Sequence, residues 1–183
     1  MFTYRAIRFT ALAVFVAAAL AACAVQPPAA RPPTLGAAVS AEEVARWDIS
    51  IPPSGAGLPP GGGTVAQGES VYATKCQSCH GPKGAGKPAD ALVGGIGSLA
   101  TATPVRTVGS YWPYATTLFD YTRRAMPIAA PFSLNNDEVY AVTAYVLFLN
   151  GIIPADATMN AQSLPAVKMP NRDGFISDWP PRR

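Results

Sequence analysis

Charged residues and histidine are scarce in this chain of 183 residues. Only 14% of the residues are Asp, Glu, Lys or Arg, and there is a single histidine. Without a large basic face, the sequence gives no indication of nucleic-acid binding. It also lacks internal repeats and any sustained alternation of polar and apolar residues, which argues against a repeat protein and a β-sheet protein. An all-α domain is therefore expected.

The apolar run near the N-terminus is too short to cross a bilayer comfortably. Residues 9–20 are uncharged and mainly apolar, whereas a spanning helix needs about 20 such residues. Arg5 and Arg8 precede the run and small residues follow it, so residues 1–22 are predicted to be a secretory signal. Residues 20–23, Leu-Ala-Ala-Cys, resemble a bacterial lipoprotein box with lipidation at Cys23. Ordinary cleavage near the same place is the alternative.

These signals predict a protein of the bacterial cell envelope that faces the periplasm and is attached to the membrane through a lipid on Cys23. The two basic residues of the signal leave with it, and all 11 acidic residues follow Cys23. The formal net charge of +3 therefore overstates the charge of the processed chain, which is close to neutral.

Proline and glycine dominate the chain before the helical domain. Residues 23–63 are predicted to be a semi-extended linker, because eight prolines and six glycines fall between residues 24 and 63. Within it, Ser40 and Glu43 form a capping-box pattern, which predicts a short helix near residues 40–47 that ends at Trp47. A large aromatic residue in a linker usually docks on the domain or on a partner.

Residues 64–153 show the apolar spacing of helices around one core. Helices are predicted over 65–76, 114–124 and 136–149. Asn135 and Glu138 form a capping box before the last helix, whose buried face should comprise Val139, Val142, Tyr145, Val146 and Leu149. Residues 154–183 lack periodicity, and we expect an extended tail that docks on a partner or on the domain.

The sequence Cys76-Gln-Ser-Cys79-His80 is the attachment motif for c-type haem. Its spacing lets two thiols add to the two vinyl groups of the porphyrin and places the histidine under the iron as the proximal ligand. A zinc site would need further cysteine or histidine ligands, and His80 is the only histidine. A thioredoxin-like motif would need a βαβ context. We therefore predict one covalent haem c and no disulfide.

The second axial position of the iron requires a methionine, because no second histidine exists. Met126 follows the motif at the end of a predicted helix and precedes Pro127, as expected of a loop that returns over the haem. Met169, in the tail, is the alternative ligand, and a plain core position is the alternative role for Met126. A Met/His pair fills both axial sites, so the iron would relay electrons and not bind a substrate.

Other residues could contact the cofactor or a partner. The loop before the middle helix carries Arg106, Trp112 and Tyr114, which are candidates to donate hydrogen bonds to a haem propionate or are simply rim residues. Three lysines lie close to the motif in the sequence: Lys75, Lys83 and Lys87. They could steer an acidic partner towards the haem edge, or they could simply form a solvated face.

Several stretches closely resemble the cytochrome subunit of the bacterial sulfur dehydrogenase and sulfite dehydrogenase complexes. The specific stretch is GSLATATPVRTVGSYWPYATTLFDYTRRAMP at 97–127, and the shorter ones are WDISI (47–51), GLPPGGGT (57–64), FLNGIIP (148–154) and MPNRDGF (169–175). The likeness extends over residues 44–180. Members of the sulfur-dehydrogenase type can be larger with a second haem region, whereas this chain has one attachment motif.

The resemblance implies a class I cytochrome c fold, with three to five helices around one haem. It also implies a molybdopterin-containing dehydrogenase subunit as the electron donor, with a soluble cytochrome or a terminal oxidase of the respiratory chain as the acceptor. One alternative is a stand-alone carrier tethered at Cys23 that serves a terminal oxidase. The other is an enzyme or gas sensor, which would require an open axial site on the iron.

Overall fold

The computed structural model describes residues 35–176. The predicted signal, Cys23 and the end of the tail lie outside these residues. The chain divides after Val44 into two units, and the second, residues 45–183, contains the motif and every helix of the predicted domain. No helix within the described residues is long and apolar enough to cross a membrane.

The short linker helix forms where the capping pattern predicts it. Helix α2 spans Ala41–Trp47. Ser40 Oγ accepts a hydrogen bond from the Glu43 N–H at 3.1 Å, which satisfies one of the donors that a helix leaves open at its N-terminus.

Four further α-helices lie in the second unit; three of them agree closely with the predicted ranges, and the short helix within the attachment motif was not predicted. These are α3 (Val65–Lys75), α4 (Gln77–His80), α5 (Ala115–Ala125) and α6 (Asn136–Leu149), with the 3-10 turn η1 (Pro82–Gly84) after α4. Capping boxes built on Thr64 with Gln67 and on Asn135 with Glu138 fix the starts of α3 and α6. Helix α6 has the predicted bounds.

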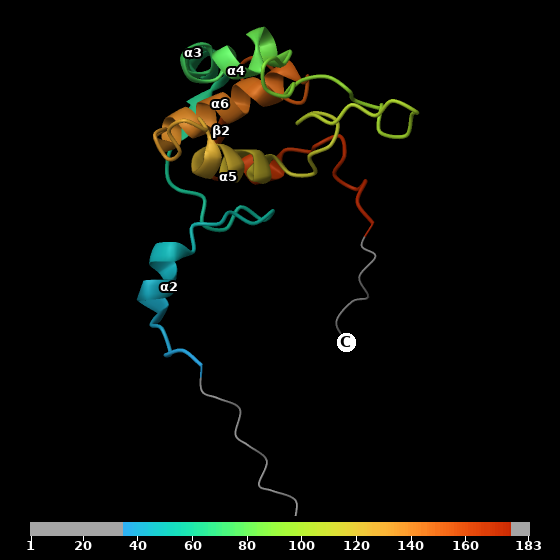
Figure 1. Cartoon of the computed structure of the whole chain (residues 1–183). Helices are drawn as coiled ribbons and strands as arrows, with labels where there is room; N and C mark the ends of the chain where they lie inside the picture. The colour runs from blue at the N-terminus through green and yellow to red at the C-terminus, as the bar shows by residue number, and fades with distance from the viewer. Residues whose placement is uncertain (1–34, 177–183) are drawn as a thin grey trace, which may run out of the picture. The chain divides into compact units, whose positions relative to one another are not determined.

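Helix α6 is more deeply buried than one apolar face would make it. It packs against both α3 and α5, and every residue from Val139 to Leu147 is buried; Figure 1 shows α6 between the other two helices. The ring centroids of Phe119 on α5 and Tyr140 on α6 lie 4.4 Å apart. The predicted face is therefore only part of the buried surface, and Leu149, at the helix end, is half-buried.

The crossing of α3 and α6 is unusually close because Gly68 has no side chain. A Cβ atom at Gly68 would overlap the backbone carbonyl of Ala141. One turn further on, the rings of Tyr72 and Tyr145 lie 5.4 Å apart. Close backbone contact followed by a tilted contact of two aromatic rings fixes the direction in which α3 carries the motif.

Two short strands were not predicted. Strand β1 (Gly62–Thr64) pairs antiparallel with β2 (Thr158–Asn160), with Gly63 opposite Met159. Three-residue strands are too short to show alternation, and glycine fills two positions of β1. A Cβ at Gly63 would also overlap the backbone of Ala141, so glycine is needed there for packing.

The first part of the tail, up to Met169, packs on the domain. Met159, Leu164 and Met169 are 5%, 0% and 3% exposed and belong to the common core, with the 3-10 turn η2 (Leu164–Ala166) between them. The packed domain thus extends beyond residue 153.

The domain also begins before Thr64. Ile51 is 6% exposed, and its N–H donates to Asp120 Oδ1 on α5 at 3.2 Å. The Tyr140 hydroxyl on α6 donates to the Pro59 carbonyl at 2.9 Å. The second half of the proline-rich segment is therefore held along α5 and α6, because these polar groups satisfy the backbone of a segment that forms no regular structure.

Replacing Gly68 with alanine tests the helix crossing. Intrinsic helix propensity alone would make Gly68→Ala stabilising by about 1 kcal/mol, whereas overlap with Ala141 should make it destabilising by about 1–3 kcal/mol. We expect the guanidinium unfolding midpoint of the holoprotein to fall. Ala66→Gly, at an exposed position of α3, calibrates propensity, and a stabilised Gly68→Ala protein would contradict the close crossing.

Candidate functional site

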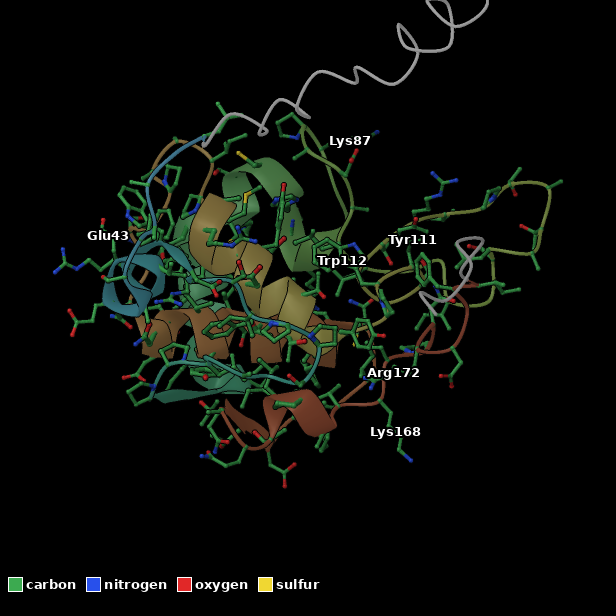
Figure 2. The ribbon with its side chains drawn as sticks, turned by 90° about the horizontal axis from the view of Figure 1, so that it is seen from below. Glu43, Lys87, Tyr111, Trp112, Lys168 and Arg172 are labelled. Carbon is green, nitrogen blue, oxygen red and sulfur yellow. The ribbon has the colours of Figure 1, made fainter. Side chains whose placement is uncertain are left out.

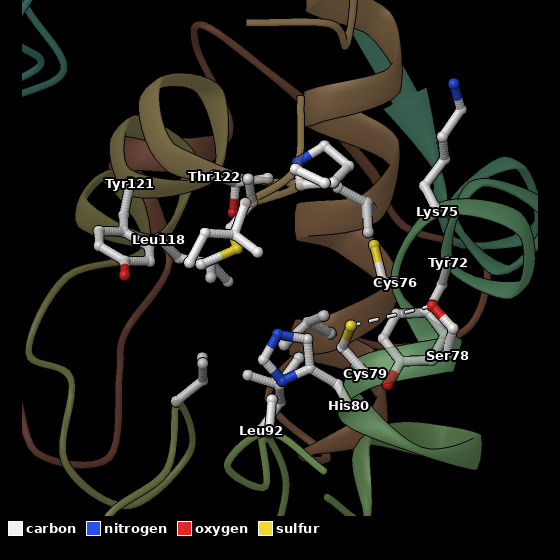
Figure 3. A pocket seen from close by; sticks show the side chains of 18 of the residues that line it. Tyr72, Lys75, Cys76, Ser78, Cys79, His80, Leu92, Leu118, Tyr121 and Thr122 are labelled. Atoms are coloured by element: carbon white, nitrogen blue, oxygen red, sulfur yellow. Dashed lines mark hydrogen bonds between the residues drawn. The ribbon is translucent and has the colours of Figure 1, made fainter. Parts of the chain in front are cut away.

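A cavity of about 350 Å³ lies between the motif on one side and α5 with the segment after it on the other. Figure 3 shows Cys76, Cys79 and His80 on one wall and Leu118, Tyr121 and Thr122 on the facing wall. Most of the lining is apolar, and α6 contributes Val142 and Val146 to it. The site is thus a pocket that suits a large apolar group and offers a few polar atoms at defined points.

The motif residues reach the cavity because the chain turns sharply between α3 and η1. Cys76 ends α3 and precedes α4, which consists of residues 77–80 alone. Gly81 follows with φ +72°, a left-handed conformation that glycine adopts without strain. The buried Tyr72 hydroxyl donates to the Gly81 carbonyl at 2.8 Å and holds this turn against α3.

The ring of His80 is oriented by the backbone. Its Nδ1 lies 2.9 Å from the carbonyl oxygen of Asp90. A carbonyl only accepts hydrogen bonds, so this contact requires the proton on Nδ1 and leaves the lone pair of Nε2 for a metal. A histidine ligand whose other nitrogen donates to a carbonyl is the usual arrangement at metal centres, since it fixes both tautomer and ring orientation.

The two cysteines are free thiols in the structure. Burial raises the pKa of Cys76 to about 11, and the neighbouring Cys79 adds to the rise. Reactive dithiol motifs of oxidoreductases depend on a thiolate with a lowered pKa. Cys76 therefore has the character of a structural attachment residue and not of a redox-active thiol. Among the described residues, no group of three or more His, Cys, Asp or Glu could hold a metal ion.

The opposite wall carries a methionine. Met126 ends α5, its N–H donates to the Thr122 carbonyl at 3.1 Å, and its side chain lines the cavity. Met159 and Met169 are buried in the core and do not line it. Among the methionines in the described part of the chain, only Met126 can face His80 across the cavity.

The irregular loop before α5 forms the third wall, and Asn150 at the end of α6 holds it. Its Oδ1 accepts from the Gly94 N–H at 3.2 Å, and its Nδ2 donates to the Leu92 carbonyl at 3.1 Å. The Thr107 hydroxyl donates back to the Gly94 carbonyl at 2.6 Å. This network places the apolar side chains of Leu92, Val108 and Trp112 at the cavity.

The structure brings together only some of the predicted contact residues. Trp112 lines the cavity, with its ring edge-on to Tyr121 at 5.8 Å. Arg106 and Tyr114 do not line it: the Arg106 guanidinium lies 5.6 Å from the Tyr111 ring centroid, and the Arg172 guanidinium lies 4.4 Å from that of Tyr114. These two candidates are therefore engaged with aromatic and cationic neighbours outside the cavity, and the structure gives no support to their assignment.

Of the three motif-proximal lysines, Lys75 lines the cavity, whereas Lys83 and Lys87 do not. Sequence reasoning did not name the apolar lining residues as site residues: Leu92, Val108, Leu118, Val142 and Val146. Helical spacing identifies Leu118, Val142 and Val146 as inward-facing, but it cannot separate a cavity wall from a filled core. Leu92 and Val108 lie in a loop and have no periodic signal.

Comparison with known proteins gives two matches. The family described as cytochrome c oxidase, cbb3-type, subunit III matches residues 63–146. A chain of the crystal structure of the sulfane dehydrogenase SoxCD from Paracoccus pantotrophus is 40% identical, with a TM-score of 0.73, over 80% of this chain and 73% of that one. No curated protein matches.

The cavity fits a covalently attached haem. Two thiols and a histidine Nε2 lie on one wall, a thioether lies on the other, and the lining between them is apolar. Such a donor set suits iron with one nitrogen and one sulfur ligand. The residues present thus satisfy the requirements of the group that the motif predicts.

Replacing Met126 tests the axial assignment. Met126→Ala should keep the covalent haem, lose the weak long-wavelength absorption band of methionine-ligated ferric haem, and lower the reduction potential, because a ligand that favours ferrous iron is removed. Visible spectroscopy and a redox titration provide the measurements. Met169→Ala is the matched control and should change neither property. The reverse pattern would show that Met169 and not Met126 is the ligand.

Proposed function

Because this chain belongs to the c-type cytochromes of the sulfane dehydrogenase family, we propose that it accepts single electrons from a molybdenum-cofactor dehydrogenase of sulfur compounds and passes them to the respiratory chain. Membership follows from 40% identity over 80% of the chain. The all-α class I cytochrome c fold predicted from the sequence is confirmed, and the protein is a haem electron carrier of sulfur oxidation with haem c as its cofactor.

Each motif residue then has a distinct part. When bound, the haem supplies a reversible one-electron couple at its iron. Cys76 and Cys79 would hold it through thioether bonds, and His80 would present Nε2 to the iron in an orientation that the Asp90 carbonyl fixes. The apolar walls from α5 and α6 exclude water, which limits the change in solvation when the charge of the site changes.

The arrangement of His80 and Met126 on facing walls is the observation that supports electron transfer over chemistry at the iron. If His80 and Met126 both bound the iron, no open position would remain for a substrate or a gas. An enzyme or gas sensor would need one wall without a ligand. The protein on its own is therefore proposed to be the electron-transfer subunit of an oxidoreductase complex and not its catalytic subunit.

The dehydrogenase partner is proposed from the family. The relative is described as a sulfane dehydrogenase, and the sequence resemblance implies a subunit with a molybdenum cofactor. Lys75 is exposed and lines the cavity next to Cys76, so a partner with acidic groups would be steered to the haem edge. The acceptor is proposed to be a soluble cytochrome or a terminal oxidase.

Charge reversal tests this docking. Lys75→Glu should slow reduction by the co-purified dehydrogenase several-fold at low ionic strength, because steering acts on the association rate and is screened by salt. Lys168→Glu, an exposed cation of the tail that does not line the haem cavity, is the control. Stopped-flow absorbance of the haem gives the rate. Failure of any molybdenum-containing protein to co-purify with the tagged chain would favour the tethered stand-alone carrier.

Anchoring at Cys23 remains a proposal based on residues 20–23. A multiply acylated cysteine anchors a protein far more firmly than one lipid chain does. Cys23→Ala removes that anchor, so it should release a membrane-associated protein into the soluble fraction or block its processing, with haem incorporation unchanged. Membrane fractionation and mass spectrometry of the mature N-terminus are the measurements. A wild-type protein found wholly in the soluble periplasm with unmodified or absent Cys23 would overturn the proposal.

A further inference from the structure

Residues 171–175 of the tail, termed the strap here, contact the loop before α5 at three points. Asn171 Nδ2 donates to the Tyr111 carbonyl at 2.8 Å. The Phe175 ring meets the Tyr111 ring edge-on with centroids 5.3 Å apart. The Arg172 guanidinium lies 4.4 Å from the centroid of the Tyr114 ring. Segments about 60 residues apart in sequence are thus joined by a hydrogen bond, a ring contact and a cation–π contact.

The strap is itself firmly rooted. Met169, just before it, is 3% exposed and part of the core. The Arg172 N–H donates to the Met169 carbonyl at 3.1 Å and the Gly174 N–H to the Asn171 carbonyl at 3.2 Å, so the strap turns back on itself at this root. Its contacts with the loop are therefore made from a fixed base.

The strap contacts Tyr111 and Tyr114, which lie on either side of Trp112 in the sequence. Tyr111 precedes it, and Tyr114 follows as the N-cap residue of α5, where its side chain makes no capping hydrogen bond. Figure 2 shows Tyr111 and Trp112 together on one side of the molecule, with Arg172 on the same side and Lys168 pointing away beyond it. Trp112 lines the haem cavity and contacts Tyr121 there.

The loop that carries Trp112 has no regular secondary structure of its own. Residues 92–112 contain no helix or strand, and the network around Asn150 and Thr107 ends at Tyr111, whose N–H donates to the Thr107 carbonyl at 3.0 Å. The Tyr111 ring also faces Arg106, and Trp112 contacts Tyr121. The contacts that join Tyr111 and Tyr114 to a distant segment of the chain come from the strap. The position of Trp112 therefore depends on the strap as well as on the Thr107 network and the contact with Tyr121.

We propose that the strap positions Trp112 as a wall of the haem cavity, with Arg172 and Phe175 as positioning residues that act through Tyr114 and Tyr111. The inference rests on the haem site proposed above. By keeping the indole over the cavity, the strap excludes water from the haem, and solvent access is one of the factors that set the potential of such a centre.

The test follows the emission of Trp112 in a holoprotein that carries Trp47→Phe and Trp179→Phe, so that Trp112 is the only tryptophan. Haem quenches indole emission strongly at short range. Arg172→Ala and Phe175→Ala should each increase the emission and lower the reduction potential, because the indole moves away and water enters. The long-wavelength band of methionine ligation should persist, since Met126 is untouched.

Two controls separate positioning from charge and from stability. Lys168→Ala removes a neighbouring exposed cation without a loop contact and should leave emission and potential unchanged. Phe175→Tyr keeps the ring and should behave as the parent protein does. If Arg172→Ala and Phe175→Ala lower only the unfolding midpoint, with unchanged emission and potential, the strap merely stabilises the fold and the proposal is wrong. Absence of covalent haem or of the methionine band in the parent protein would instead refute the haem site, which is a separate outcome.

Discussion

The crossing of α3 and α6 at Gly68 is the packing constraint on which the site depends. Because the backbones approach so closely there, α3 cannot rotate or slide without a clash at Ala141. The contact of Tyr72 with Tyr145 then fixes the end of α3, and the hydroxyl of Tyr72 holds the turn at Gly81. The positions of Cys76, Cys79 and His80 follow from a contact in which none of them takes part.

The sequence predicts the parts of the fold whose signals are local. Helix α6 begins at a capping box and ends before Gly151, so its bounds were predictable to the residue. The place of Met126 at the cavity was predictable because it follows a helix and precedes proline, and its role as an iron ligand stays a prediction. Strands β1 and β2 and the burial of Ile51 and Met169 depend on partners far along the chain. Arg106 and Tyr114 were assigned from loop position alone, which does not determine side-chain direction.

The chemistry of the cavity is set as much by its apolar walls as by its ligands. Burial raises the pKa of the Cys76 thiol to about 11, so this thiol is protonated at neutral pH. In the same apolar surroundings, a change of charge at the iron costs free energy, and a larger change costs more. Transfer of one electron at a time keeps that change small. An apolar cavity with His80 and Met126 among its lining residues fits the carrier role proposed above.

Two segments outside the helical core contact elements that form the site. One precedes the core in the sequence and the other follows it. Residues 51–63 bind α5 and α6 through Asp120 and Tyr140, and the tail adds β2, η2 and the strap. Both contact the elements that carry Met126 and Trp112, while within residues 35–176 no hydrogen bond joins either segment to the attachment motif. Since α4 is already fixed by α3, the wall that needs external support is the one formed by α5 and its preceding loop. The additions to the core therefore support the methionine side of the cavity, where ligand distance and water access are decided.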